Sequence, residues 1–142
     1  SNNVARVIVK DESVKILCLT RSSVESSKFD LANALKATFE MAGYTVTLSG
    51  SYPGWKPNVN SPVLKLLRET YEKLFDEKPS VVACHAGLEC GILGTNYPEM
   101  DMISFGPTIQ GAHSPDEKAN IKSAQKFWKF LLIILENIPQ KK

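Results

Sequence analysis

Cysteine is scarce in this chain, and long apolar or basic runs are missing. The three cysteines, Cys18, Cys84 and Cys90, are an odd number and lie in or beside apolar runs, so they do not form the disulfide framework of a small secreted domain. A reducing compartment, the cytoplasm, is expected. The longest apolar run, residues 130–135, is far shorter than the roughly 20 residues of a membrane-spanning helix, so no membrane partner is expected.

The chain also has no long run of charges of one sign. Seventeen basic and 15 acidic residues are interspersed and leave a formal charge of +2. No basic run is long enough to neutralise a row of phosphates, so nucleic acid is not an expected partner. What remains is an ordinary globular composition, 43% hydrophobic over 142 residues, enough for a core of moderate size. Strand-like sequence begins within a few residues of Ser1, without a start methionine, so the chain is interpreted as a fragment.

The first 52 residues predict a β-β-α-β layer. Two β-rich runs, residues 4–9 and 14–20, flank a polar turn and predict a hairpin. Apolar residues at helical spacing predict a helix over 23–42, with Gly43 at its left-handed end. Period-2 alternation over 44–49 then predicts a half-buried strand.

Two prolines and a glycine mark a linker at residues 53–60, where Trp55 is expected to pack in the turn. Beyond it the expected elements are helices and buried strands. Ser61 as N-cap and Pro62 predict a helix over 62–77, and an apolar stripe that includes Trp128 predicts a helix over 119–138. Continuous apolar runs at 80–84 and 102–105 predict parallel strands, joined by a crossover with a short helix at 88–93. The fold class is therefore α/β.

Candidate ligands follow the two expected parallel strands. His85 and Glu89 come after the first, and His113 lies 24 residues beyond Glu89, in the loop after the second. Ligands of open α/β sheets bind beyond the carboxyl ends of the strands, so these side chains are expected to converge. Imidazole and carboxylate at such loops are typical of a hydrolytic metal centre, of which this chain holds one half.

Five ordered motifs resemble the C-terminal part of the aminoacyl-histidine dipeptidases, the bacterial Xaa-His dipeptidases. They are LTRSS at 19–23, SYPGWKP at 51–57, HAGLECG at 85–91, YPEMD at 97–101 and GPTIQGAHSPDE at 106–117. The resemblance covers nearly the whole chain. These enzymes are similar to a wide family of dinuclear metallopeptidases and deacylases whose catalytic α/β domain is interrupted by a lid, which often mediates dimerisation.

The resemblance implies a division of the chain. Residues 1–52 correspond to the last part of the lid, and residues 61–142 to the C-terminal segment of the catalytic domain. Two divalent ions, expected to be zinc, would be held mostly by residues of a missing N-terminal portion, which also carries the general-base Glu. Among the family's metal ligands, His113 matches the final His.

Each candidate residue has a plainer alternative. Spacing alone favours His113 as a loop histidine that hydrogen-bonds locally; the resemblance favours metal ligation, with Asp116 orienting the ring or, with Ser114, capping the last helix. Glu89 either complements a helix N-terminus or binds the substrate's α-amine, a contact that counts against an N-acyl substrate.

His85 and Arg21, the other two candidates, also have a structural and a functional interpretation. His85 either pairs with Glu89 or is a satisfied core histidine. Arg21 is either a solvated arginine or, as the resemblance implies, the group that binds the substrate carboxylate. No catalytic base is expected in this chain.

The expected function is metal-dependent hydrolysis of Xaa-His dipeptides by the full-length protein, with the isolated chain inactive. Two alternatives remain open. The chain could be a non-catalytic binding or dimerisation module, or the enzyme could be a related aminopeptidase or deacylase with another substrate. Open sheet edges also favour a homodimer.

Overall fold

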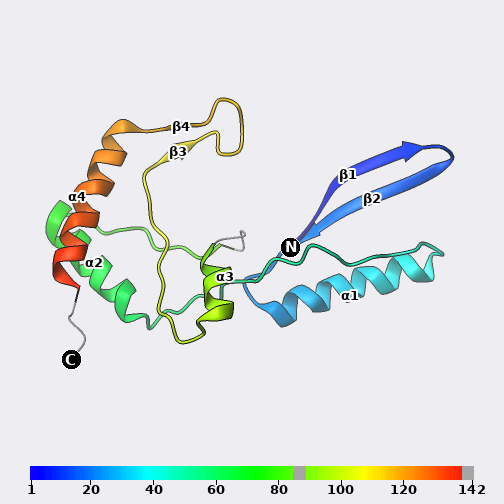
Figure 1. Ribbon diagram of the computed structural model, residues 1–142, viewed down its shortest axis with the longest axis horizontal. Coiled ribbons are helices and arrows are strands. Elements are labelled where there is room, and N and C mark those ends of the chain that lie inside the picture. Colours follow the sequence, from blue (N-terminus) through cyan, green and yellow to red (C-terminus); the bar gives the residue numbers. More distant parts are fainter. Residues whose placement is uncertain (85–88, 139–142) are drawn as a thin grey trace. The chain divides into compact units, whose positions relative to one another are not determined.

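The computed structural model describes residues 1–84 and 89–138, which contain four helices and four short or medium strands (Figure 1). This mixture confirms the expected α/β class. The chain forms two compact units, one of Ser1–Pro57 with Val82–Met100 and one of Asn58–Val81 with Asp101–Lys142. Their first boundary falls between Pro57 and Asn58, and the assignment of 1–52 to a lid and 61–142 to a catalytic domain stays a prediction.

The first unit begins with the predicted hairpin, drawn in blue in Figure 1. Strands β1 (Asn2–Lys10) and β2 (Ser13–Thr20) pair antiparallel, with a bulge between Val4 and Arg6. Asp11 and Glu12 have φ angles of 49° and 60°, which matches a type I′ turn and the right-handed twist of the two strands. The hairpin prediction is confirmed.

Helix α1 (Glu25–Met41) follows, within the predicted range of 23–42. It ends in a Schellman motif: the N–H of Tyr44 donates to Phe39 O and that of Gly43 to Glu40 O, both at 3.0 Å. Gly43 has a φ of 87°, as its position after the helix predicts, and the rings of Phe39 and Tyr44 meet edge to face at 6.0 Å. Local chemistry therefore determines where this helix stops.

The strand predicted over 44–49 does not form. Residues 44–58 have no regular secondary structure and run back from the end of α1 (Figure 1). Alternation of apolar residues makes a segment suited to a sheet, but a strand also needs a neighbour for its backbone hydrogen bonds, and no described strand pairs with this one. The prediction of a paired β-β-α-β layer is wrong in its last strand.

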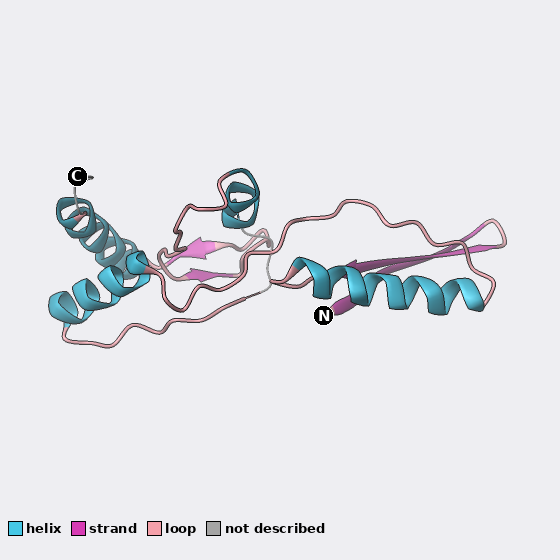
Figure 2. Ribbon diagram, turned by 90° about the horizontal axis from the view of Figure 1, so that it is seen from below, coloured by secondary structure: helices cyan, strands magenta, loops and turns pink. Residues whose placement is uncertain are grey.

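The second unit is built on α2 (Pro62–Phe75) and α4 (Ile121–Asn137), which lie against each other in Figures 1 and 2. Leu67, Phe130 and Ile134 are buried between them. Around these three, a second set of partly buried residues packs: Val63, Tyr71, Leu74, Phe75 and Ile103. The helix predicted over 62–77 is confirmed, and its apolar side chains pack on α4.

The face predicted for α4 is partly wrong. Its buried residues are Phe130 and Ile134, whereas Trp128 of the predicted stripe is 59% exposed. The ring of Phe130 contacts Tyr71 of α2 at 5.3 Å and Phe105, in the segment before β3, at 5.6 Å, so aromatic packing turns this face of α4 toward the core. Residues 127–135 of α4 are apolar on almost every side of the helix. The periodicity of the sequence therefore could not show which side is buried.

The two parallel strands predicted at 80–84 and 102–105 are also not formed among the described residues. Both segments lack regular structure, and Val82 is 82% exposed. Continuous apolar runs suit a strand covered on both faces, but residues 81–84 are exposed. The run at 102–105 packs through Ile103 and Phe105 on the helical core without pairing to a described strand. The short helix expected at 88–93 is present as α3 (Glu89–Asn96). No helix among the described residues combines the length and apolar character needed to cross a membrane.

Candidate functional site

His113 lies in a loop closed by a small hairpin that the sequence did not predict. Strands β3 (Ile109–Gln110) and β4 (Lys118–Ala119) pair antiparallel on either side of residues 111–117. His113 has a left-handed φ of 64°, and its N–H donates to Glu117 Oε2 at 2.8 Å. The side chain is exposed. The loop therefore holds the backbone of His113 in a defined turn while its imidazole faces solvent.

Ser114 and Asp116 do not cap the last helix. Ser114 Oγ donates to Gly111 O at 2.7 Å and accepts from Asp116 N at 3.3 Å, so it stabilises the His113 turn itself. The N-cap of α4 is Asn120, whose side chain accepts from Ser123 N at 2.9 Å. The capping prediction was wrong because Asn120, immediately before the helix, provides the acceptor.

Arg21 follows the last residue of β2. Its backbone N–H donates to Ser1 O at 2.9 Å, which extends the hairpin ladder by one position. The side chain is exposed, and among the described residues its guanidinium makes no hydrogen bond or ion pair. The residue is thus anchored by its backbone at the end of a strand.

Glu89 is the first residue of α3, and its side chain is exposed. A carboxylate here lies beside the positive end of the helix dipole, which agrees with the plainer of its two interpretations and leaves its oxygens accessible for the other. His85 lies outside the described residues. The strands that were expected to bring Glu89 toward His113 are not formed, and the two residues belong to different compact units. Their convergence stays a prediction.

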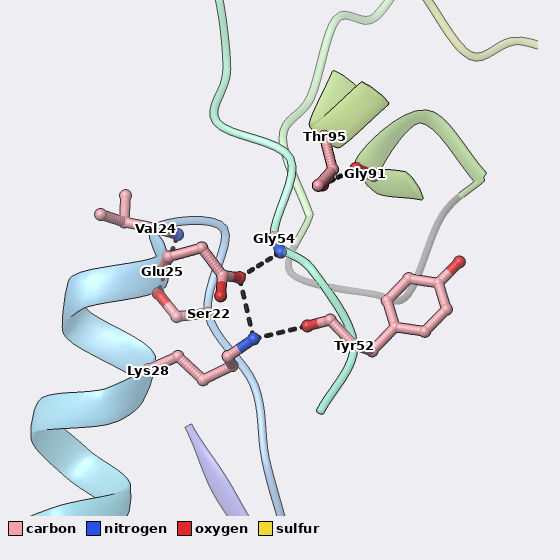
Figure 3. Close-up of polar contacts among 8 residues, drawn as sticks. All are labelled: Ser22, Val24, Glu25, Lys28, Tyr52, Gly54, Gly91 and Thr95. Carbon is pink, nitrogen blue, oxygen red and sulfur yellow. Dashed lines mark hydrogen bonds and ion pairs between the residues drawn. The ribbon is translucent and has the colours of Figure 1, made fainter. Parts of the chain in front are cut away.

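An unpredicted polar cluster connects α1 to the SYPGWKP segment (Figure 3). We call it the Lys28 junction: the side chains of Glu25 and Lys28 with the backbone groups of Tyr52 and Gly54. Lys28 Nζ donates to Glu25 Oε1 at 2.8 Å and to Tyr52 O at 2.6 Å, and Gly54 N donates to the same Glu25 oxygen at 2.5 Å. The hydrogen bond from Lys28, with the one from Gly54, lowers the pKa of the Glu25 carboxyl.

Around this junction, two glycines lie very close to the backbone of other segments. A Cβ on Gly54 would lie 2.7 Å from Ser22 O, and a Cβ on Gly91 would lie 2.6 Å from Pro53 O. Both positions therefore require glycine for packing, not for a left-handed φ. Sequence reasoning missed the junction because its partners are backbone groups. The available signal was the i, i+3 spacing of Glu25 and Lys28 on the predicted helix.

A second ion pair lies in the other unit and is of a different kind. Lys126 Nζ lies 2.7 Å from Glu77 Oε2 and over the ring of Phe75 at 4.3 Å. The hydrogen bond between them lowers the pKa of Glu77 and raises the pKa of Lys126. Because both side chains reach solvent, we expect a small contribution to stability. The Lys28 junction, with its buried ammonium, is the more constrained of the two.

Of the ligands that the predicted metal centre needs, the described residues offer only the imidazole of His113. Within residues 1–84 and 89–138, no three His, Cys, Asp or Glu side chains cluster closely enough to hold a metal ion. His113 is accessible and could donate one imidazole, but a structural or catalytic zinc ion takes three or four protein ligands. The three cysteines are free, and Cys18 and Cys84 are exposed. The described residues alone do not fit a metal centre.

Comparison with known proteins decides the family. Residues 3–137 match the model of peptidase family M20/M25/M40. The chain belongs to this family. Its resemblance to the dipeptidases is thereby confirmed at the family level.

Two relatives extend the match over the whole chain. The chain is 47% identical over 141 residues to the cytosol non-specific dipeptidase of Escherichia coli, covering 99% of this chain and 29% of that protein. It superposes on the crystal structure of aminoacylhistidine dipeptidase from Vibrio alginolyticus with a TM-score of 0.81 and 43% identity, covering 100% of this chain and 29% of that one. The chain therefore spans under a third of the length of either relative.

Proposed function

We propose that this chain is the C-terminal part of a longer metal-dependent dipeptidase that hydrolyses Xaa-His dipeptides. The observation that carries the proposal is the identity of 47% and 43% to two dipeptidases, along essentially the whole chain in each case. The two relatives are named for different specificities, so the preferred dipeptide is the quantity to measure.

The domain division is part of the proposal. Residues 1–52 would be the last part of a lid, 53–60 the linker, and 61–142 the segment that completes a catalytic domain. The exposed apolar run at 80–84 supports this division, because it suits a strand covered by elements that the described residues do not contain. Residues 44–49 suit a strand of the lid for the same reason.

The site residues would have separate roles. His113 would supply one imidazole to a dinuclear zinc site completed by residues outside this chain. Glu89 would bind the α-ammonium of the substrate, and Arg21 would bind its carboxylate with a planar guanidinium. His85, outside the described residues, would orient Glu89. The accessible side chains of His113, Glu89 and Arg21 support these roles. When bound, the metal ions would supply the Lewis acid for peptide hydrolysis.

A cytoplasmic location and a homodimer complete the proposal. The cytoplasmic location is supported by three free cysteines and by the name of the Escherichia coli relative. The homodimer is supported by the hairpin of β1 and β2, which has apolar side chains such as Val7 and Val9 exposed at 56% and 74%.

The test is a paired assay of this chain and the full-length protein, with zinc added and metal content measured. The substrates are β-alanyl-histidine, a dipeptide without histidine, and N-acetyl-histidine. We expect hydrolysis and about two bound ions per chain only in the full-length protein. Preference for the dipeptide without histidine would change the substrate class, and cleavage of N-acetyl-histidine would favour a deacylase. Inactivity of both proteins on every substrate would favour a binding module.

A further inference from the structure

We propose that Lys28 and Glu25 are positioning residues that restrain the backbone beside Arg21 and the helix that begins with Glu89 relative to each other. The inference rests on the proposed function, in which Arg21 and Glu89 bind the two ends of the substrate. Neither Lys28 nor Glu25 would contact substrate. All the contacts that carry the inference lie within the first compact unit.

The first step is the burial of Lys28. Its side chain is 7% exposed, on a helix whose other lysine–glutamate pair, Lys36 and Glu40, is 40% and 47% exposed. A buried ammonium is unfavourable unless its donors are satisfied. Here Nζ donates to Glu25 Oε1 and Tyr52 O, and it lies 5.1 Å from the centre of the Phe29 ring. The charge is therefore tied to the backbone of the SYPGWKP segment.

The second step connects this segment to Arg21. Glu25 Oε1 accepts from both Lys28 Nζ and Gly54 N, so one oxygen joins helix α1 to the backbone at Gly54 (Figure 3). Gly54 in turn packs on the backbone of Ser22 and Ser23, with no room for a Cβ. Ser22 directly follows Arg21, and its Oγ accepts from Val24 N at 3.1 Å. The junction thus restrains the backbone beside Arg21.

The third step connects the same segment to Glu89. Gly91, two residues after Glu89, is buried against the carbonyl of Pro53. Thr95 Oγ1 donates to Gly91 O at 3.0 Å within the same short helix (Figure 3). Pro53 and Gly54 are therefore packed between the backbone that follows Arg21 and the helix that begins with Glu89.

These contacts have a consequence for specificity. An enzyme that binds the ammonium of one residue and the carboxylate of the next must hold its two binding groups at one distance. Substrate binding depends on groups held within a fraction of an ångström, because ordering a loose site on binding lowers affinity. Loosening the Lys28 junction should therefore weaken binding of substrates that use both contacts, and affect less those that use one.

The experiment uses the full-length protein with the variants Lys28→Met and Glu25→Gln, and Lys36→Met as the matched control on the same helix. Each is assayed on β-alanyl-histidine and on its C-terminal amide, which lacks the carboxylate for Arg21. We expect KM for β-alanyl-histidine to rise about tenfold in Lys28→Met with little change in kcat, and a smaller change on the amide. Lys36→Met should match the wild type. In the Arg21→Ala background, Lys28→Met should have little further effect, since coupled residues are not additive.

Hydrogen exchange of the same proteins gives a readout independent of activity. Loss of the Glu25 acceptor or the Lys28 charge should speed exchange at the amide of Gly54, and Lys36→Met should not. An active wild type with unchanged KM in Lys28→Met, or with equal losses on the dipeptide and the amide, would overturn the inference. A wild type that hydrolyses no dipeptide would overturn the proposed function instead. Should Lys28→Met fail to fold, Glu25→Gln decides by the same comparison of acid and amide.

Discussion

The carboxylate of Asp101 accepts a hydrogen bond from Ser61 Oγ at 2.7 Å, across 40 positions of sequence. The same oxygen accepts from Val63 N at 3.0 Å, while Ser61 Oγ accepts from Leu64 N at 2.9 Å. Two of the unsatisfied N–H groups at the start of α2 are thereby paired. Asp101, the last residue of the YPEMD motif, thus extends a local N-cap into a tertiary contact.

Removal of this carboxylate should destabilise the second unit. We expect Asp101→Ala to lower the free energy of unfolding of the full-length protein by about 1–3 kcal/mol, because Ser61 is buried and Val63 N loses its acceptor. Glu69→Ala, at an exposed position of α2, is the control and should stay within about 0.5 kcal/mol of wild type. Denaturant unfolding measures both. Equal effects of the two changes would contradict the capping role.

Gly54→Ala should be destabilising for steric reasons. Its Cβ would lie within 2.8 Å of the backbone at Ser22 and Ser23, and backbone cannot rotate away as a side chain would. We expect a loss of about 1–3 kcal/mol in the free energy of unfolding. Gly106→Ala is the matched control, since nothing lies within 4 Å of its Cβ and its φ is not left-handed. A Gly54→Ala protein as stable as Gly106→Ala would exclude the close packing.

Glu25 predicts a dependence of stability on pH. Its folded pKa is lowered by the hydrogen bonds from Lys28 and Gly54, so its contribution is present above the unfolded pKa and is lost as pH falls through the folded value. The difference in free energy of unfolding between wild type and Glu25→Gln should therefore be present near neutrality and shrink below about pH 4.3, the ordinary value for Glu.

The size of this effect should be moderate, because the Glu25 side chain is 48% exposed and salt screens it in part. Glu40→Gln, in the more exposed pair on α1, should show a flatter profile over the same range. A wild-type advantage over Glu25→Gln that persists undiminished to about pH 3 would show that the carboxylate charge is not what stabilises the junction.

His113→Asn separates metal binding from turn formation. Asn tolerates the left-handed φ of 64° at this position, so the loop should keep its backbone while it loses the imidazole. We expect the full-length protein to melt as wild type does, to bind less metal, and to lose activity by about a hundredfold or more. Lys118→Gln, exposed in β4 of the same hairpin, should leave both unchanged. Full activity in His113→Asn would favour the alternative of a local loop histidine.

Much of the local structure could be predicted because its signals are short-range. Neighbouring residues were enough to predict the first hairpin and the end of α1 at Gly43. They also predicted the start of α2, with Ser61 as N-cap and Pro62 as its first residue. The three site residues that the structure describes were candidates from their types and motifs alone. The predictions of further strands were wrong because a strand needs a partner. The alternation at 44–49 and the apolar runs at 80–84 and 102–105 favour strands but do not identify the segments they would pair with.

The helices, the hairpin of β1 and β2 with its turn, and membership of a peptidase family follow from the amino-acid sequence. The burial of Lys28, and the packing of Pro53 and Gly54 between residues 22–23 and Gly91, follow only from the folded chain. A helix forms hydrogen bonds between residues four positions apart, and the side chains that start and end it are close to it in the sequence. The partners of Lys28 are a neighbouring carboxylate and a backbone carbonyl 24 positions away, and a backbone group has no signature in the sequence.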